Sequence, residues 1–332
     1  MEAAHLRKPN GMQPLLVTRP GYWLVILGLL SLVVWGLWAV ADQWINGLGV
    51  TGMNNRAYWG LEIVNFVFFI GLSAGGIIIA ALVHAGGMEK FKPVARIAEL
   101  LAISCLMLAL LFILISIGRP DRLFNLFIYG RITSSPLAWD VAIIFAYLAL
   151  ALALGYFGTR ADLVRCMQAL PGRRSLYKLL ALGYTDLSPK ALARDRRVLV
   201  VLSWIAIPGA IALHSLTAWI LGLVKARPFW HTALIAPLFV TSAMVSGLAL
   251  LIVTVVLARR FFKLDIKDEV IAGMGRLLFF AVPVLGYLLA AELLTVAYPN
   301  EPGRLSVYED MIWGQYASLF WFDLIAGLLL PL

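Results

Sequence analysis

The sequence predicts an all-α protein that crosses a membrane about eight times. Hydrophobic residues make up 62% of the 332 residues, and charged residues make up only 14%. Soluble domains are about one-quarter charged and less than half apolar, so this composition is typical of a polytopic membrane protein. The net charge of +9 then reflects Lys and Arg in cytoplasmic loops, and it gives no indication of nucleic-acid binding.

Eight apolar runs are long enough to cross the lipid bilayer as helices, which takes about 20 residues each. They lie at 22–41, 58–84, 97–117, 137–158, 198–223, 231–257, 274–297 and 313–332. The first run ends in a small-residue stretch that resembles a signal-peptide cleavage site, but it is longer than a signal core of about 7–15 residues. We therefore expect an uncleaved first span. The last run is still apolar at Leu332, so a continuation of the chain with a ninth span stays open.

Lys and Arg are distributed unequally between the two sets of connections. The segment 1–21 and the connections 85–96, 159–197 and 258–273 hold 19 of them, and the alternate connections hold 7. Positive charges concentrate in cytoplasmic loops, so we expect a cytoplasmic N-terminal segment (1–21) and a basic cytoplasmic loop (159–197).

Five polar residues inside the apolar runs fall at a similar depth. At about 1.5 Å per residue, Glu62, Asn65, Asp140, His214 and Glu292 all lie in the outer half of the membrane, on four different helices. A charged side chain at the centre of a bilayer costs roughly 2.5–3.5 kcal/mol even on the mildest scale, so it should face a partner or a cavity. Their shared depth predicts one polar intramembrane site.

Each of these residues also has a structural interpretation. Glu62 and Asp140 could stabilise helix starts, where a carboxylate is favourable, and His214 could be a core histidine bonded to a backbone carbonyl. Glu292 lies well inside its apolar run, so a functional role is favoured. Asp323, nearer the middle of the membrane, could serve a proton route or pair with Arg276 or a tyrosine.

Two connections on the predicted outer side carry positive charges, although positive charges normally concentrate in cytoplasmic loops. Arg119, Asp121 and Arg122 follow the third span, and Arg227 lies between the fifth and sixth. These residues could bind lipid headgroups, or they could dock a soluble protein and stabilise a polar headgroup.

The cysteine and histidine content argues against a bound iron–sulfur cluster or haem. Two cysteines cannot supply the four thiolates of a cluster, and no metal site is expected. Of four histidines, only His214 lies centrally in a span. Bis-histidine ligation of two haems needs four intramembrane histidines, so we expect no haem.

Four ordered motifs resemble the polysulfide reductase membrane-subunit family, the NrfD/PsrC-like integral membrane quinone-binding subunits. They begin at Trp59, Ile115, His214 and Leu319 and read W-G-L-E-I-V-N-F-V-F-F-I-G-L-S-A-G-G, I-S-I-G-R-P-D-R-L-F-N-L-F with S-S-P-L-A-W-D, H-S-L-T-A-W-I-L-G-L-V-K-A-R-P-F-W-H-T-A-L-I-A-P-L-F, and L-F-W-F-D-L-I-A-G-L-L-L-P-L. The resemblance extends from about residue 55 to the end of the chain.

The resemblance implies a haem-free, quinone-binding anchor subunit of a respiratory oxidoreductase complex in the bacterial or archaeal cytoplasmic (inner) membrane. Its expected partners are a periplasmic, ferredoxin-like iron–sulfur subunit with several clusters and a molybdopterin-type catalytic subunit. Its expected cofactor is menaquinone or ubiquinone. The family fold is two four-helix bundles, which would occupy residues 22–158 and 198–332.

The polar residues in the spans and the resemblance together give expected roles to individual residues. Quinone would bind near the periplasmic face among Glu62, Asn65, Asp140, His214, Thr217 and Glu292. His214, Asp140 and Glu292 would take part in the proton chemistry. A proton route would involve Asp323 and Ser73, although alternative complex III relatives tend to have His near the position of Ser73. A quinol-oxidising subunit of alternative complex III and a secondary transporter are the alternatives.

Overall fold

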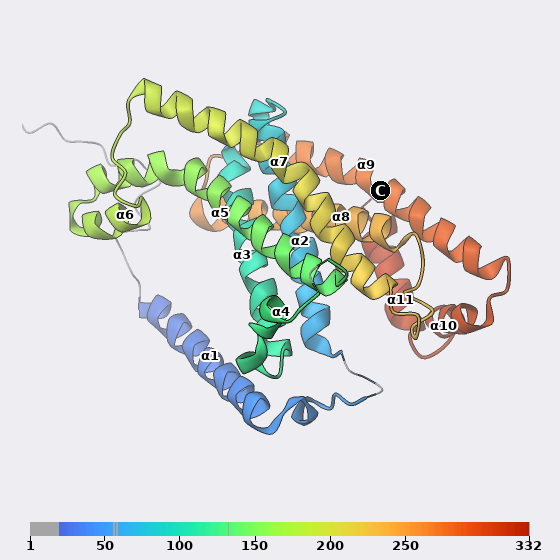
Figure 1. Cartoon of the computed structure of the whole chain (residues 1–332). Helices are drawn as coiled ribbons and strands as arrows, with labels where there is room; N and C mark the ends of the chain where they lie inside the picture. The colour runs from blue at the N-terminus through green and yellow to red at the C-terminus, as the bar shows by residue number, and fades with distance from the viewer. Residues whose placement is uncertain (1–19, 56, 58, 132, 332) are drawn as a thin grey trace, which may run out of the picture.

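The computed structural model describes residues 20–331 except 56, 58 and 132. Within these residues the secondary structure is entirely helical (Figure 1). Most of the predicted N-terminal segment 1–21, the predicted first residue of the second span (Tyr58) and Leu332 lie outside the described residues.

Seven helices are long and apolar enough to cross a membrane, which confirms the predicted multi-span, all-α class. They are α1 (Pro20–Asn46), α2 (Leu61–His84), α3 (Lys92–Ser116), α5 (Pro136–Ala169), α7 (Pro189–Gly222), α8 (Ile235–Phe262) and α9 (Asp268–Ala297). The connections contain the short helices η2 (Leu48–Thr51), η3 (Glu89–Phe91), η4 (Pro120–Arg122), α4 (Asn125–Ile128), η5 (Pro171–Arg173) and α6 (Arg174–Leu180).

The predicted eighth span is a bent pair of helices. α10 (Pro302–Ile312) is followed by α11 (Ala317–Asp323) and the π-helix η6 (Leu324–Leu329), and the chain turns by 79° between α10 and α11. The bend closes tightly at Gly314, where an added Cβ would lie 2.7 Å from Asp310 Cα. The apolar run that starts at 313 therefore begins inside this bend.

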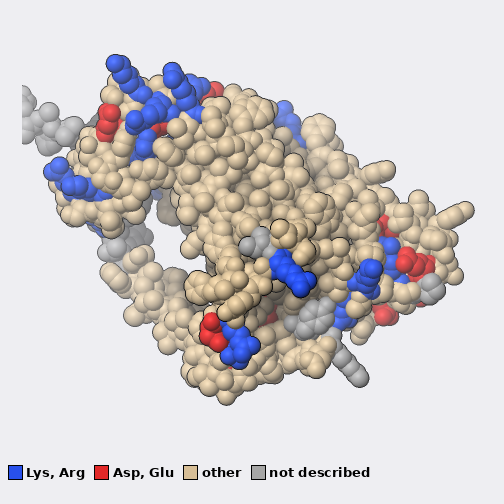
Figure 2. All heavy atoms as spheres, in the orientation of Figure 1, with Lys and Arg blue, Asp and Glu red and all other residues tan. Residues whose placement is uncertain are grey.

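The predicted basic loop 159–197 is largely helical, which corrects the predicted span ends. α5 continues to Ala169 and α7 begins at Pro189, with α6 between them. Hydropathy marks only the part of a helix that lies in hydrocarbon, whereas Lys and Arg are good helix formers and allow a helix to continue into water. Figure 2 shows Lys and Arg gathered over this end of the molecule.

The starts of α5 and α7 are built alike. Ser135 and Ser188 accept hydrogen bonds from the backbone N–H groups of Ala138 and Ala191, and proline follows each serine. A serine N-cap with proline at the first helical position satisfies one free N–H and presets the backbone. These caps fix where both helices begin.

α2 is the most buried of the long helices and packs against α3, α7 and α8. Its contact with α8 depends on glycine, because a Cβ added at Gly75 would lie 2.0 Å from the carbonyl carbon of Gly247. Small residues allow such close approach of two helix backbones within a membrane. The α2–α8 contact places the middle of α2 beside α7 and α8.

α1 is set apart from the other helices. No residue in its most apolar stretch is buried, and Gln43 near its end donates a hydrogen bond of 2.7 Å to the carbonyl of Ile115 on α3. Helices of the two predicted bundles are in direct contact, since α2 packs on α7 and α8 and α5 packs on α7. The division into bundles at 22–158 and 198–332 stays a prediction.

Candidate functional site: a polar group between α5 and α7 beside two membrane-facing cavities

Asp140 and Thr217 form a buried pair between α5 and α7. Thr217 Oγ1 donates a hydrogen bond of 2.7 Å to Asp140 Oδ1, and Asp140 is 1% exposed. Asp140 Oδ2 is buried with no hydrogen-bond partner among the described residues. Ser135 caps α5, so the interpretation of Asp140 as the helix cap is wrong. A buried carboxylate oxygen without a partner is rare in folded proteins and calls for an explanation.

His214 lies one turn before Thr217 and contacts two backbone carbonyls. Its Nδ1 lies 2.6 Å from the carbonyl of Ala210, and its Nε2 lies 3.3 Å from that of Ile70 on α2. Ser73 Oγ also donates to the Ile70 carbonyl, at 2.6 Å. The expected backbone bonding of a buried histidine is therefore present, and it joins α7 to α2.

Two cavities meet at His214. One, of about 280 Å³, is lined by His214 and Thr217 together with Ser242 and Ser246 of α8. The other, of about 430 Å³, has an almost wholly apolar lining that includes Trp204. Trp204 is more than half exposed on the membrane-facing side of α7. The site thus combines a hydroxyl-lined part and an apolar part on either side of one imidazole.

Glu292, for which a functional role was favoured, is held in a separate set of contacts, and its predicted roles in quinone binding and proton chemistry stay predictions. It forms an ion pair with Arg304 of α10, and Thr232 Oγ1 donates to its second oxygen at 2.7 Å. Arg304 also contacts Glu301 at 3.3 Å. These contacts join α9, α10 and the α7–α8 connection. Neither cavity at His214 is lined by Glu292, because the segment that carries Arg304 folds back as α10.

The other predicted site residues lie apart from His214. Glu62 and Asn65 are half-buried in the first two turns of α2 and do not line the two cavities. Ser73 is fully buried, whereas Asp323 is exposed at the end of α11. The predicted roles of Glu62 and Asn65 in quinone binding, and of Ser73 and Asp323 in a proton route, stay predictions.

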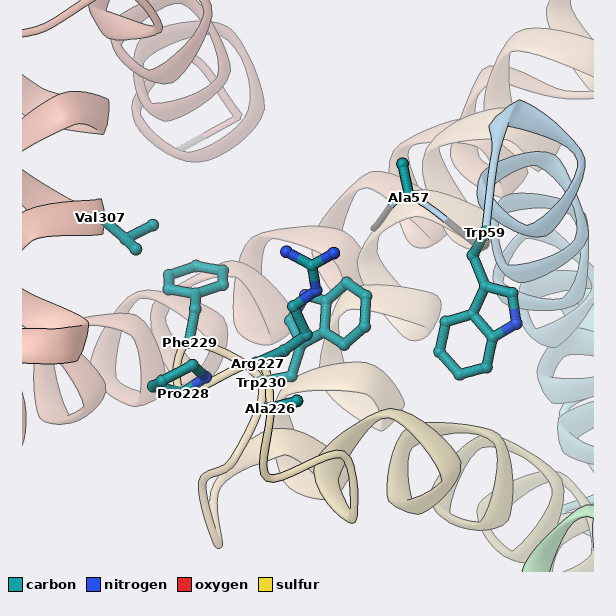
Figure 3. Close-up of a pocket in the computed structure, with 8 residues that line it drawn as sticks. All are labelled: Ala57, Trp59, Ala226, Arg227, Pro228, Phe229, Trp230 and Val307. Atoms are coloured by element: carbon teal, nitrogen blue, oxygen red, sulfur yellow. The ribbon is translucent and has the colours of Figure 1, made fainter. Parts of the chain in front are cut away.

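The two charged outer connections are built differently. Arg119 forms two hydrogen bonds to Asp121, of 3.0 and 2.9 Å, and this guanidinium holds the pKa of the Asp121 carboxyl below its usual value. Arg227 lines a cavity of about 400 Å³ beside the stacked rings of Trp59 and Trp230, whose centroids are 5.8 Å apart (Figure 3). The Trp59–Trp230 stack holds the α7–α8 connection against the segment before α2.

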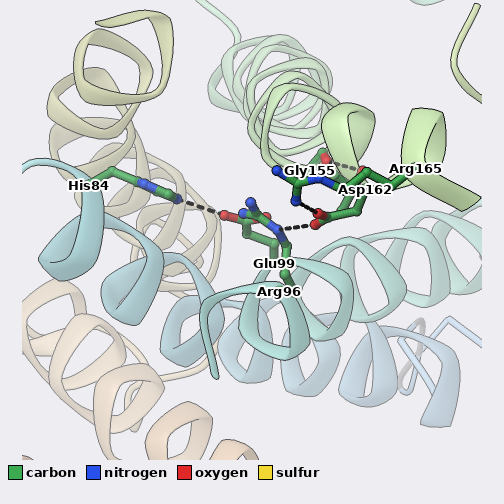
Figure 4. Close-up of polar contacts among 7 residues, drawn as sticks. His84, Arg96, Glu99, Gly155, Asp162 and Arg165 are labelled. Carbon is green, nitrogen blue, oxygen red and sulfur yellow. Dashed lines mark hydrogen bonds and ion pairs between the residues drawn. The ribbon is translucent and has the colours of Figure 1, made fainter. Parts of the chain in front are cut away.

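Sequence reasoning missed a polar network on the predicted cytoplasmic side. Glu99 of α3, fully buried, contacts His84 Nε2 at 2.9 Å and Arg96 Nη1 at 3.4 Å (Figure 4). Arg96 and Arg165 both contact Asp162 of α5. The sequence signal for this network was Glu99 inside one apolar run and His84 at the end of the run before it.

A second buried ion pair lies close to this network. Arg160 of α5 forms two hydrogen bonds to Asp195 of α7. Its guanidinium also lies 4.0 Å from the centroid of the Tyr184 ring, a favourable cation–π distance. Asp195, Arg96 and Asp162 line a polar cavity of about 480 Å³. Every buried carboxylate described on this side thus has a cationic partner.

Among the described residues, no three His, Cys, Asp or Glu side chains lie close enough together to hold a metal ion. The polar groups around His214 instead offer hydrogen-bond donors and acceptors beside an apolar cavity.

Comparisons with known proteins agree with this architecture. Residues 49–332 match the family described as polysulphide reductase, NrfD. A Halobacterium salinarum protein named as a membrane subunit of dimethyl sulfoxide reductase is 37% identical over 93% of this chain and 68% of its own length. A selenate reductase subunit of Mesobacillus selenatarsenatis is 28% identical over 91% and 70%. An integral membrane subunit of a Hdr-like menaquinol oxidoreductase from Archaeoglobus fulgidus is 26% identical over 94% and 70%.

The family match covers most of the chain and includes every helix that contributes to the site. The predicted resemblance is therefore confirmed, as is the prediction of a multi-pass protein of bacterial and archaeal membranes. The chain belongs to the NrfD family of polysulphide reductase membrane proteins.

Proposed function

We propose that the chain is the quinone-binding membrane subunit of a multi-subunit respiratory oxidoreductase. The observation that carries this proposal is the pair of cavities that meet at His214. A quinone has a polar ring and a long apolar tail. The cavity with Thr217, Ser242 and Ser246 suits the ring, and the apolar cavity along Trp204 suits the tail. Relatives named as menaquinol oxidoreductase and menaquinone reductase membrane subunits support the same ligand class.

Oxidation of a bound quinol releases two electrons and two protons. Thr217 lines the ring cavity and donates to Asp140, so its hydroxyl can accept a hydrogen bond from the ring while linking it to the carboxyl behind. Asp140 Oδ2, which has no described partner, can hold a proton. His214 lines the same cavity one turn away on α7, where its imidazole, held by backbone carbonyls on both nitrogens, offers a flat face for the ring to pack against. Groups that exchange protons within hydrogen-bond reach of the reacting atoms are what such chemistry requires.

Electrons would pass to an iron–sulfur subunit docked on the predicted outer face, beside a molybdopterin-type catalytic subunit. Relatives named as subunits of dimethyl sulfoxide and selenate reductases support such an assembly. The α7–α8 connection is the proposed docking surface, because Arg227, Trp230 and Phe229 line an outer cavity there (Figure 3).

The test compares two Thr→Val variants of the complex purified in mild detergent. Thr217→Val should lower quinol-dependent turnover by at least about tenfold and leave assembly with the iron–sulfur subunit intact. Thr241→Val is the matched control, because Thr241 is partly buried on α8, lines neither cavity at His214 and donates to the carbonyl of Pro237. Equal turnover in wild type and Thr217→Val, or a chain that purifies alone and moves solute in vesicles, would contradict the proposal.

A further inference from the structure

An apolar cavity of about 420 Å³ lies where the end of α3, the η4–α4 connection and the start of α5 meet. Leu114, Phe127 and Val141 are among its lining residues. Arg122 is the single charged residue in the described lining, which is otherwise entirely apolar. The cavity is separate from those at His214 and shares no lining residue with them.

The depth of the cavity matches one half of a bilayer. On α5 its lining extends from Leu137 to Phe145, which is about 12 Å along a helix axis. The hydrocarbon of one leaflet is about 15 Å thick, half of the whole core. Arg122 lies at the shallow end, beside the turn that leaves the membrane, so the cavity has the polarity and length of a lipid chain below its headgroup.

Of the two arginines that flank Asp121, Arg122 is the one whose donors remain available to a ligand. Asp121 is engaged by two hydrogen bonds from Arg119, and Arg122 Nε lies 4.0 Å from the same carboxylate, beyond hydrogen-bond distance. The side chain of Arg122 is 65% exposed. A guanidinium presents donors in the geometry that matches a phosphate, and no acidic residue among those described lines the cavity to repel one.

The chemistry of the lining distinguishes a phospholipid from a quinone. A quinone ring needs neighbouring groups that accept and release protons, and the described residues of this lining have no imidazole, carboxyl or hydroxyl group. A soluble partner protein cannot fill a cavity that extends into hydrocarbon. We propose that this cavity binds one acyl chain of an anionic phospholipid, with Arg122 holding its phosphate.

Native mass spectrometry of the purified complex tests the proposal directly. The detergent is supplemented with equal amounts of phosphatidylglycerol and phosphatidylcholine that carry the same acyl chains. The wild type should retain about five times more phosphatidylglycerol than phosphatidylcholine, because one Arg near an anionic headgroup gives a preference of this size. Arg122→Gln should bring the ratio close to one, and Arg122→Lys should keep most of the preference.

Two matched pairs of variants separate the cavity from general effects. Leu114→Trp fills the cavity and should lower retention of both lipids, whereas Leu108→Trp, at a similarly exposed position of α3 outside the lining, should not. Arg131→Gln removes the same charge from the same connection without touching the cavity and should leave the ratio unchanged.

Three results would overturn the proposal. One is an unchanged lipid ratio in Arg122→Gln. Another is displacement of phosphatidylglycerol by added inorganic phosphate, which would show that the apolar cavity contributes nothing. The third is menaquinone that stays bound to the wild type and to Thr217→Val but is lost from Leu114→Trp. The first two results leave the quinone site at His214 untouched, because the two sites share no lining residue. The third would count against both proposals, because it would place menaquinone in this cavity and not beside Thr217.

Discussion

Two groups of buried polar residues, one on the predicted cytoplasmic side and one around Asp140, differ in how completely they are paired. On the predicted cytoplasmic side, Glu99 has both His84 and Arg96 as partners, and Arg160 and Asp195 are bonded to each other. In the predicted outer half, Asp140 has only a hydroxyl partner on one oxygen and no described partner on the other.

This difference separates a structural role from a functional one. A buried charge is costly unless it is paired and hydrogen-bonded, so the fully paired residues hold α2, α3, α5 and α7 together. Asp140, which is incompletely paired and is linked through Thr217 to a ligand-sized cavity, has no such structural explanation. Among the buried carboxylates described, completeness of pairing, rather than burial or depth, distinguishes the one at the candidate site.

The largest expected effect is on the fully paired side. Arg160→Ala leaves Asp195 buried without its cation and should lower the free energy of unfolding by about 3–5 kcal/mol. Unfolding in mixed micelles, followed by circular dichroism on addition of sodium dodecyl sulfate, measures the loss. The double variant Arg160→Met with Asp195→Leu should recover most of it, because no charge is left unpaired. A loss below about 1 kcal/mol in Arg160→Ala would contradict the structural role given to the paired residues.

Glu292 and Asp140 give the next test, because sequence reasoning placed both in one polar site. Glu292→Gln takes the ion-pair partner from buried Arg304 and should lower the free energy of unfolding by about 3 kcal/mol. Asp140→Asn should change it by about 1 kcal/mol and lower quinol-dependent turnover at least about tenfold. Equal destabilisation by the two variants would show that Asp140 is structural as well.

A smaller effect is expected in the middle of α2, where the two regions are joined. Gly75→Ala places a methyl group against the backbone of Gly247 and should destabilise the protein by about 1–3 kcal/mol. Gly71→Ala is the control, because its added Cβ would lie 3.8 Å from the Ala243 side chain, an ordinary contact. The same unfolding assay should show a change within about 0.5 kcal/mol for the control. Equal losses would mean that close α2–α8 packing is unimportant.

The smallest expected effect is the pH dependence of the exposed Arg119–Asp121 pair. The pKa of Asp121 is below its ordinary value in the folded state, so its contribution to stability is present above about pH 4. It is lost as the pH falls through the folded-state pKa. Asp121→Asn should therefore lower the apparent Tm at pH 7 by about 1 °C or less and leave it unchanged near pH 2. A difference that persists at low pH would assign the effect to something other than this carboxylate.

The sequence was sufficient for the membrane class, the approximate spans and the family, because these depend on long apolar runs and ordered motifs. It could not give the ends of α5 and α7, since basic residues continue a helix beyond the hydrocarbon. It also could not show that α10 folds back to bring Arg304 onto Glu292. Packing contacts such as Gly75–Gly247 determine which helices are neighbours and how each helix is rotated about its own axis. Hydropathy carries no information about such contacts.

The same limit applies to the candidate site. Similar depth suggested one group of five residues, and the structure brings together His214, Thr217 and Asp140 but not Glu292. Depth along a helix follows from residue number, whereas the direction of a side chain depends on which face of the helix meets its neighbour. Glu99 was overlooked for a related reason, because its partner His84 lies at the end of another span.

The contacts of His214 have a mechanical consequence. A neutral imidazole carries one N–H, yet its two nitrogens face the carbonyls of Ala210 and Ile70, so only one contact is a full hydrogen bond at a time. Both nitrogens are therefore occupied by backbone, and the imidazole connects α7 to α2 where the two cavities meet. A shift of either helix along the other would break one of these contacts, so the spacing of the two helices and the rotamer of His214 are linked.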